Sequence, residues 1–574
     1  MYLNIEETLT KLEILEALFP DHCEIFTLPE QTVENREVWA LRVRTNSGQA
    51  KHGILIIAGL HAREWGNTDI VIFFIEAILN AYNASSDIVL GNKTYTAAEI
   101  QSIVDNLDIF IVPVTNPDGK HFSFQDGNDE QGETKNMWRK NRRVNQGSPC
   151  RGVDLNRNFD ILWDFNTKMH PDSLWDNVSS WCQGVQAVSA HPCDATYHGD
   201  RAFSEPETRN IRSLLDAYKH IRFFIDVHGT KGIVLMPWGH EEIQNNDPYM
   251  RFLNDAYDGL RGLTDTVISS SPYCSSQPAD PDGSAYREYM HPVDQSRFEI
   301  LGETQRQAIE DVRGQVYGFA PGFTGLYGIT GGTKDYGLSR HIADPNLPKV
   351  DTFLYEYGID TDFQPPFEDP SAPDDMTRVI RDCASGLISL CINAQRVPIV
   401  DHSPKIIDFG KVRIGSSEHS VIRLVNKSTR DIEITNVNVI SVNPVPFTVS
   451  DPPQYYIAPD QSADIRVAAS PADTEPYKAF VGIEFRYYDE KTIHDVRMIE
   501  CMAAGCEVDE DACMAPIFRA NNIFFCILFT IVTSLVIAVL LPFIWIPSVY
   551  CRIKRLWFRI QHCTSGNRDT CTEL

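Results

Sequence analysis

The chain has 574 residues and carries 78 acidic against 51 basic side chains, which gives a formal charge of −27. This acidic surplus argues against nucleic acid or an anionic membrane surface as the main partner. With 43% hydrophobic and 22% charged residues, the composition is that of folded globular protein and excludes a disordered or repetitive chain.

Strands and helices alternate along residues 1–398, which predicts an α/β domain with a largely parallel sheet. Short apolar runs bounded by turn residues mark the strands, and longer amphipathic runs mark the helices. The predicted strands lie within 39–45, 53–60, 108–114, 223–227 and 353–358, and the predicted helices within 1–20, 69–83 and 373–396. Two polar stretches, 161–192 and 241–300, are predicted to be inserted loops, and long loops in α/β enzymes usually flank the site.

From residue 404 to residue 500 the pattern changes to short strands, with turn residues between them about every 8–12 positions. This spacing predicts an antiparallel β-sandwich. The opening strand, DFGKVRIG, resembles that of immunoglobulin-like modules of the sperm-protein and ciliary type. The sequence of this domain does not indicate what it binds.

The end of the chain predicts a membrane anchor. An acidic stem over 501–522 contains three cysteines, for which a disulfide or free thiols are favoured over metal ligation. Residues 523–546 contain no charge and are long enough to cross a bilayer as one transmembrane helix. The tail, 547–574, opens with basic residues, and the positive-inside rule places it in the cytoplasm.

This single-pass type I topology places the rest of the chain on the extracellular or luminal side of the membrane. The first 20 residues lack the basic and apolar regions of a signal peptide. We therefore expect a leader that precedes this sequence, rather than a span that serves as its own signal. Asn-x-Ser/Thr sequons at Asn83, Asn92, Asn177 and Asn426 agree with an extracytoplasmic location.

Candidate metal ligands follow two of the predicted strands. His61 and Glu64 lie on the turn after strand 53–60, and His228 ends a second strand. Ligands at the C-terminal ends of parallel strands converge, although His228 alone could be an ordinary surface histidine. A hydrolytic zinc site takes two or three histidines with a carboxylate and leaves one position open to water.

Further polar residues stand where a substrate would be held. Arg139 lies in MWRKNRR, and Asn156 and Arg157 lie in GVDLNRNFD, where they can clamp a carboxylate. Tyr327 lies on a glycine-rich loop. Glu356 ends an apolar strand, where a charged residue needs a reason.

The motifs HAREW, WRKNRR, GVDLNRNFD, DVHG, YGITGGTKDYG and YEYG closely resemble, in order and spacing, those of the A/B-type zinc metallocarboxypeptidases, the funnelin family, over residues 1–398. The resemblance implies a mixed eight-stranded sheet flanked by helices and one zinc ion per chain. The roles that it implies are His61, Glu64 and His228 as zinc ligands, Glu356 as general base, Arg139 as the donor to the oxyanion, Asn156, Arg157 and Tyr327 as the holders of the substrate's C-terminal carboxylate, and Arg63 as an accessory contact.

The family also pairs two cysteines that match Cys150 and Cys193. The resemblance therefore implies a disulfide and an oxidising compartment. The sequence departs from the family at Thr230, where a tyrosine is frequent, and shows no recognisable inhibitory prodomain.

One pocket residue, directly before the aspartate of the GGxxD segment, sets the preferred side chain in this family. Here it is Lys334, and Gly239 matches the small residue that leaves room in the pocket. A buried ammonium attracts a carboxylate and repels Lys or Arg. We therefore predict removal of C-terminal Glu or Asp, and the pocket resembles that of carboxypeptidase O. The alternatives are a Lys334 side chain that turns to solvent or pairs with Asp335, and an apolar preference.

The predicted function is thus a membrane-anchored zinc carboxypeptidase that acts on peptide and protein C-termini. Two other classes compete. A receptor or adhesion protein with an inactive peptidase-like domain would have lost a ligand or the base, and none is lost. A cytosolic enzyme that trims glutamates fits the acidic preference, but its family carries a different zinc motif, and the predicted span and disulfide argue against it.

Overall fold

A computed structural model describes residues 1–507 of the chain, apart from 47, 172, 174–186, 264–285, 360–361, 370, 373, 451 and 453–454. The predicted transmembrane segment, 523–546, and the basic tail lie outside the described residues. Within the part of the chain that the structure describes, no helix combines the length and the hydropathy needed to cross a bilayer.

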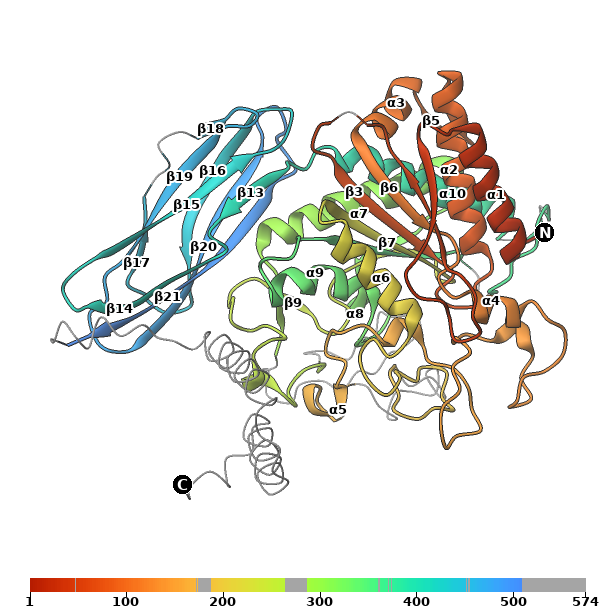
Figure 1. Ribbon diagram of the computed structural model, residues 1–574, viewed down its shortest axis with the longest axis horizontal. Coiled ribbons are helices and arrows are strands. Elements are labelled where there is room, and N and C mark those ends of the chain that lie inside the picture. The colour runs from red at the N-terminus through yellow and green to blue at the C-terminus, as the bar shows by residue number, and fades with distance from the viewer. Residues whose placement is uncertain are drawn as a thin grey trace, which may run out of the picture. The chain divides into compact units, whose positions relative to one another are not determined.

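An eight-stranded mixed sheet forms the centre of the N-terminal domain (Figure 1). Its order is β1-β2-β6-β3-β7-β12-β8-β11. The inner strands β6, β3, β7 and β12 run parallel, while β1 and β2 pair antiparallel and β8 runs antiparallel to β12. The bounds are β1 (Cys23–Thr27), β2 (Trp39–Val43), β3 (His52–Ala58), β6 (Leu107–Val112), β7 (Ile221–Gly229), β8 (Ile233–Met236), β11 (Gly318–Pro321) and β12 (Asp351–Tyr357). The predicted mixed eight-stranded sheet is confirmed.

Helices cover both faces of this sheet. Two of them begin with capping boxes, in which Asn4 pairs with Glu7 and Thr96 with Glu99, so that orphan backbone N–H groups are satisfied. The bounds are α1 (Ile5–Leu18), α2 (Gly66–Ala84), α3 (Ala97–Asn106), α4 (Pro117–Ser123), α5 (Phe165–Lys168), α6 (Pro206–Ala217), α7 (Pro292–Arg313), α8 (Gly322–Gly325), α9 (Thr333–Ala343) and α10 (Met376–Ala394). Short strands β4 (Ile88–Leu90), β5 (Lys93–Tyr95), β9 (Ile243–Gln244) and β10 (Glu288–Tyr289) form two small ribbons.

Strand β3 contributes to two hydrophobic cores, one on each face of the sheet. Ile54 and Ile56 pack in the core that contains α1, α2, α3, α7 and α10, whereas Leu55 and Ile57 pack in the core that contains α6. Successive strand residues point to opposite faces, so a strand that is apolar throughout residues 54–58 must be covered twice. This double cover explains why the sequence of β3 shows no polar alternation.

The predicted inserted loop over 241–300 is wrong in part, because it contains β9, β10 and the first turns of α7. Helix α7 begins at Pro292 with His291 as its N-cap. Its apolar residues, such as Phe298 and Leu301, are sparse near the start, so the polar sequence there resembles a loop.

The C-terminal domain is a sandwich of two sheets, with orders β13-β15-β19-β17 and β14-β21-β20-β16-β18. Along β19 inward residues alternate with outward ones, which is the pattern of a sheet with one buried face. The bounds are β13 (Val400–Ser403), β14 (Ile406–Arg413), β15 (Glu418–Asn426), β16 (Ile432–Ile440), β17 (Phe447–Val449), β18 (Tyr456–Ile457), β19 (Ser462–Ala469), β20 (Pro476–Tyr487) and β21 (Asp495–Cys506). The predicted β-rich domain is confirmed.

The start of the predicted stem at residue 501 is wrong, because β21 continues to Cys506. Cys501 points into the sandwich core as a buried free thiol, and Cys506 is disulfide-bonded. The apolar alternation of β21 extends through both cysteines, so the strand pattern in the sequence overlaps the predicted stem.

Candidate active site

The candidate metal ligands meet at the C-terminal ends of two neighbouring parallel strands. His61 and Glu64 lie on the turn that follows β3, and His228 is the penultimate residue of β7. All three side chains are buried, and their ligand atoms lie within 4.8 Å of one another. The predicted convergence of these residues is therefore present in the structure.

The donor atoms of these three residues face a common point. The Nδ1 atom of His61 lies 3.0 Å from Nδ1 of His228 and 2.8 Å from a Glu64 carboxylate oxygen. The opposite ring nitrogens are held by carboxylates: Nε2 of His61 by Asp154 at 3.1 Å, and Nε2 of His228 by Asp226 at 2.7 Å. Such carboxylate–histidine pairs orient imidazole ligands toward a metal. The set fits one zinc ion, which takes imidazole and carboxylate donors.

Asp154 also connects the ligands to two arginines. It accepts hydrogen bonds from Nε of Arg139 and from the backbone N–H of Asn156, both at 3.0 Å. Arg139 and Arg157 outweigh the burial of Asp154 and hold the pKa of its carboxyl well below the usual range. The carboxylate therefore stays charged while it orients both a ligand and a cation.

Glu356 lies beside the ligand cluster on β12, in register with His228 on β7. Burial, followed by the negative charge of Glu64, raises the pKa of Glu356 to about 7. A dication bound beside it would favour its ionised form. The side chain is thus placed beside the metal ligands as a candidate proton acceptor.

One cavity of 110 Å³ opens between these groups. Arg63 and Lys231 also line it, and Thr230 contributes to its wall. The predicted catalytic and substrate-binding residues that line it are Arg63, Arg139, Asn156, Arg157, Tyr327, Lys334 and Glu356. The structure therefore brings the predicted set together, with Gly239 behind the side chain of Lys334.

Two residues of the short turn at Leu155–Arg157 present polar groups to this cavity. Asn156 is fixed because its Oδ1 accepts a hydrogen bond from the backbone N–H of Thr333 at 2.9 Å. Arg157 donates to the carbonyl oxygens of Ala187 and Asn156. Its Nη2 is buried and makes no hydrogen bond with any residue that the structure describes. That atom is a donor available to a ligand.

Arg63 is held differently from the other cations in the cavity. Its guanidinium lies over the ring of Phe363, 4.1 Å from the centroid. Burial and the charge of Arg139 lower its pKa to about 10. The side chain therefore presents a positive charge at the cavity wall that is only partly compensated.

Lys334 is 3% exposed and passes through a slot between two glycines. A Cβ atom added at Gly239 would lie 2.1 Å from its Nζ, and one added at Gly322 would lie 1.9 Å from its Cε. Lys334 lines the cavity but forms no ion pair within 4.0 Å among the described residues. The absence of a side chain at both glycines is what allows a lysine to fill this position.

Asp335 does not pair with Lys334, because other donors occupy it. Its carboxylate accepts the backbone N–H of Gly239 at 2.8 Å and the imidazole of His240 at 2.9 Å. Despite burial, the hydrogen bonds of His240 to Asp335 and Glu288 raise the pKa of His240 to about 9. Neither alternative orientation of Lys334, toward solvent or onto Asp335, is the one in the structure. Burial lowers the pKa of Lys334, and Asp335 opposes that shift only in part.

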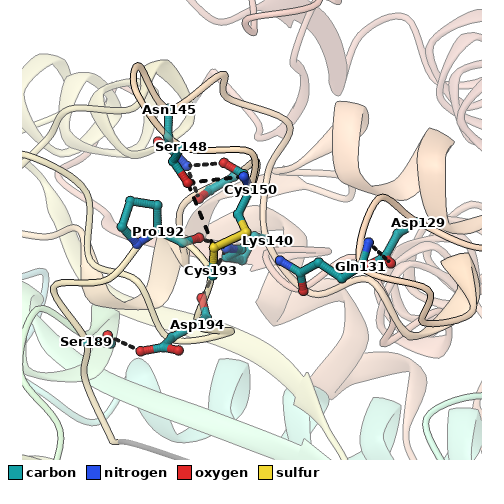
Figure 2. Close-up of a disulfide and its surroundings, with 11 residues drawn as sticks. Asp129, Gln131, Lys140, Asn145, Ser148, Cys150, Ser189, Pro192, Cys193 and Asp194 are labelled. Atoms are coloured by element: carbon teal, nitrogen blue, oxygen red, sulfur yellow. Dashed lines mark hydrogen bonds between the residues drawn. A yellow bond between two sulfur atoms is a disulfide. The ribbon is translucent and has the colours of Figure 1, made fainter.

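A disulfide joins Cys150 to Cys193 (Figure 2). Beside it, Nζ of Lys140 donates to the carbonyl oxygens of Pro192 and Asp194 at 2.6 and 3.0 Å. These links tie the 192–194 loop to the segments that carry Arg139 and Asn156. The disulfide implied by the resemblance is confirmed.

Sequence reasoning missed four residues of this site. Asp154 and Asp226 lie inside the motifs GVDLNRNFD and DVHG, but their role as holders of the histidines requires the folded geometry. Lys231 and Gly322 line the cavity without any sequence signal that marks them.

Comparison with known proteins agrees with this arrangement. A family model described as zinc carboxypeptidase matches residues 8–368, and one described as a HYDIN/CFA65/VesB-like, Ig-like domain matches residues 398–496. Carboxypeptidase A2 of Rattus norvegicus is 30% identical over 276 residues, which are 48% of this chain and 56% of that protein. Carboxypeptidase A1 of Homo sapiens is 30% identical over 270 residues, 47% of this chain and 54% of that protein. The chain thus spans about half the length of the curated relatives it matches.

Among solved structures, thrombin activatable fibrinolysis inhibitor is 19% identical, with a TM-score of 0.46 over 69% of this chain and 74% of that chain. The carboxypeptidase A of Helicoverpa armigera is 20% identical, with a TM-score of 0.45 over 69% of this chain and 73% of that chain.

Proposed function

The chain belongs to the zinc carboxypeptidase family, and from this premise we propose that it is a membrane-anchored metallocarboxypeptidase that removes glutamate or aspartate from peptide and protein C-termini. The observation that carries the acidic preference is Lys334, which lies buried against the cavity without an ion pair among the described residues. A buried cation without a counter-charge favours a ligand that brings one.

His61, Glu64 and His228 would hold one zinc ion, with Asp154 and Asp226 fixing the two imidazoles. Zinc, when bound, supplies a Lewis acid that polarises a carbonyl and makes water acidic enough to react near neutral pH. The proton transfers and the binding of the substrate are carried out by side chains of the protein.

Glu356 takes the proton of the attacking water and later delivers it to the leaving amine. Arg139 donates to the carbonyl oxygen as that oxygen gains negative charge. A preorganised donor of this kind contributes about 3 kcal/mol to the transition state. Because Arg139 is already held by Asp154, it needs no reorganisation when the charge develops.

The α-carboxylate of the substrate would bind Nη2 of Arg157 together with Asn156 and Tyr327. A peptide without a free C-terminus would leave Nη2 of Arg157 buried without an acceptor, which costs the desolvation of that donor. This requirement restricts the enzyme to the last residue of a chain.

The side chain of the last residue would extend toward Lys334. A Glu or Asp carboxylate pairs with the ammonium, whereas Lys or Arg is repelled. A second candidate is an apolar preference, which Leu235, Leu326 and Ile329 in the cavity wall favour. It would require Lys334 to bind substrate as a neutral amine, and the lowered pKa of Lys334 points in that direction.

For location, we infer a single-pass type I protein whose catalytic domain lies on the extracellular or luminal side. The uncharged segment 523–546 and the basic residues after it support the anchor. The disulfide between Cys150 and Cys193 supports an oxidising compartment.

The test is an assay of the full chain on N-blocked dipeptides that end in Glu, Gln, Phe or Lys, each with and without a zinc chelator. Gln is the matched control for Glu, because it has the same shape without the charge. We expect chelator-sensitive release of Glu well ahead of Gln and no release of Lys. Equal release of Glu and Gln would rule out the acidic preference. No release of any residue by zinc-loaded protein would rule out the carboxypeptidase activity.

A further inference from the structure

The sandwich joins the peptidase domain through a buried interface. Residues 395–399 alone connect α10 to β13, and Met1–Gly505 form one compact unit. Charged side chains from both domains meet in this interface with little exposure to solvent.

Asp495, the first residue of β21, is the sandwich carboxylate at the centre of this interface. It is fully buried, and its Oδ1 accepts from three peptidase cations: Arg297 at 2.9 Å, Lys349 at 3.2 Å and Arg222 at 3.4 Å. Its second oxygen accepts from Arg497, of the sandwich itself, at 2.6 Å.

Among the described residues, the peptidase domain supplies two carboxylates to these three cations. Asp351 accepts from Arg297 at 2.8 and 2.9 Å and pairs with Arg222 at 2.8 Å. Asp294 pairs with Lys349 at 2.5 Å. Because a buried cation without a partner is strongly unfavourable, the peptidase half of the cluster depends on Asp495 for its third counter-charge.

The cluster lies at the start of the two strands that carry the chemistry at their other ends. Arg222 is the second residue of β7 and Asp351 the first of β12. The two strands pair in parallel from Asp351 to Tyr357, and this ladder places Glu356 opposite His228. The sandwich thus holds the beginnings of the strand with a metal ligand and of the strand with the base.

Apolar and peripheral contacts reinforce the same interface. Ile493, in the turn before β21, is fully buried and belongs to the hydrophobic core of the peptidase domain. Glu490 accepts two hydrogen bonds from Arg396, at 2.7 and 2.9 Å. The ring of Phe480 lies under the guanidinium of Arg251, 4.4 Å away.

The geometry points to a sandwich that is a fixed clamp on the peptidase, with Asp495 as a positioning residue for β7 and β12. The clamp keeps His228 and Glu356 in register by giving the peptidase cations at the opposite ends of their strands a third carboxylate. This role goes beyond the proposed activity, and its stability and zinc readouts do not depend on which substrate is cut.

The experiment compares Asp495→Asn with Asp464→Asn in the full chain. Asp464 is the matched control, since it is a sandwich aspartate that is 42% exposed and pairs with Arg423 at 2.8 Å on the surface. We expect Asp495→Asn to lower the unfolding midpoint of the peptidase by about 5 °C, to release zinc at lower chelator concentration, and to lower kcat roughly tenfold with KM unchanged. Asp464→Asn should match the wild type in all four measurements.

Two results would overturn the proposal. One is an Asp495→Asn protein that matches Asp464→Asn in midpoint and zinc retention. The other is a lowered midpoint with an unchanged kcat per bound zinc. That result would mean that Asp495 stabilises the fold but does not position the catalytic strands. If Asp495→Asn does not fold, the same measurement is made on the peripheral variant Glu490→Gln. We expect this variant to lower the unfolding midpoint of the peptidase by less than about 5 °C. An unchanged midpoint would contradict the proposal.

Discussion

Replacement of Lys334 by methionine should abolish the preference for acidic residues while leaving the fold intact. Methionine is unbranched and of similar length, so it can follow the slot between Gly239 and Gly322 that the lysine stem occupies. The substitution removes the positive charge and keeps the packing. It therefore isolates the electrostatic part of substrate recognition.

The magnitude follows from the burial of the ammonium. Two unit charges about 4 Å apart attract by about 4 kcal/mol at an effective dielectric constant of about 20, and desolvation of the substrate carboxylate offsets part of this. A charge-assisted hydrogen bond retains about 1.5–3 kcal/mol net. At 1.4 kcal/mol per tenfold, this corresponds to about 10- to 150-fold in kcat/KM. Lys334 makes no competing ion pair among the described residues, which favours the upper part of this range.

The assay is the ratio of kcat/KM for paired substrates ending in Glu and Gln. We expect a large ratio in the wild type and a ratio near one in Lys334→Met, with kcat/KM for Phe increased. Lys231→Met is the control, because Lys231 is a second lysine that lines the same cavity. An unchanged ratio in Lys334→Met, or loss of the ratio in Lys231→Met alone, would refute the assignment.

Three further predictions concern the same site and its support. Gly322→Ala should reduce the Glu-over-Gln ratio, because the new methyl would lie 1.9 Å from Cε of Lys334 and displace the ammonium. An unchanged ratio would show that the slot does not position Lys334 for substrate binding. Burial lowers the pKa of Lys334, so the ammonium loses its proton at a lower pH than an exposed lysine does; the Glu-over-Gln ratio should fall as pH rises through that pKa, and a flat profile would contradict a buried lysine. Replacing Cys150 and Cys193 together by serine opens a loop closed over 43 residues and should cost about 4 kcal/mol of unfolding free energy; denaturant unfolding that matches the wild type would contradict this.

The sequence predicted the metal cluster well because strand geometry places its residues almost by itself. A residue just after the end of a buried parallel strand emerges at one edge of the sheet, so His61 and His228 had to approach each other once β3 and β7 paired. The identity of the third donor, Glu64, followed from its spacing on the turn. Lys334 was located through the resemblance to the carboxypeptidase family, in which the residue before the aspartate of the GGxxD segment lines the pocket.

Other features depend on contacts between distant segments and could not be predicted. The role of Gly322 is set by the path of a lysine stem that arrives from α9. The helix α7 begins in a polar stretch because its start is covered by charged neighbours instead of apolar ones: Asp294 and Arg297 both belong to the buried cluster with Asp495. Arg297 and Asp495 are 198 residues apart in the chain, so their ion pair leaves no local pattern in the sequence. The sandwich itself was predicted, but its attachment to the catalytic strands was not.

The most direct test of the account compares wild-type protein with Glu356→Gln for zinc content and for release of C-terminal glutamate in the same preparation. The account predicts one zinc ion per chain in both proteins, with Glu release in the wild type and a loss of at least about 10²-fold in the variant. Glutamate release that survives Glu356→Gln, or wild-type protein that cleaves without zinc, would contradict the assignment of this site as a zinc carboxypeptidase centre.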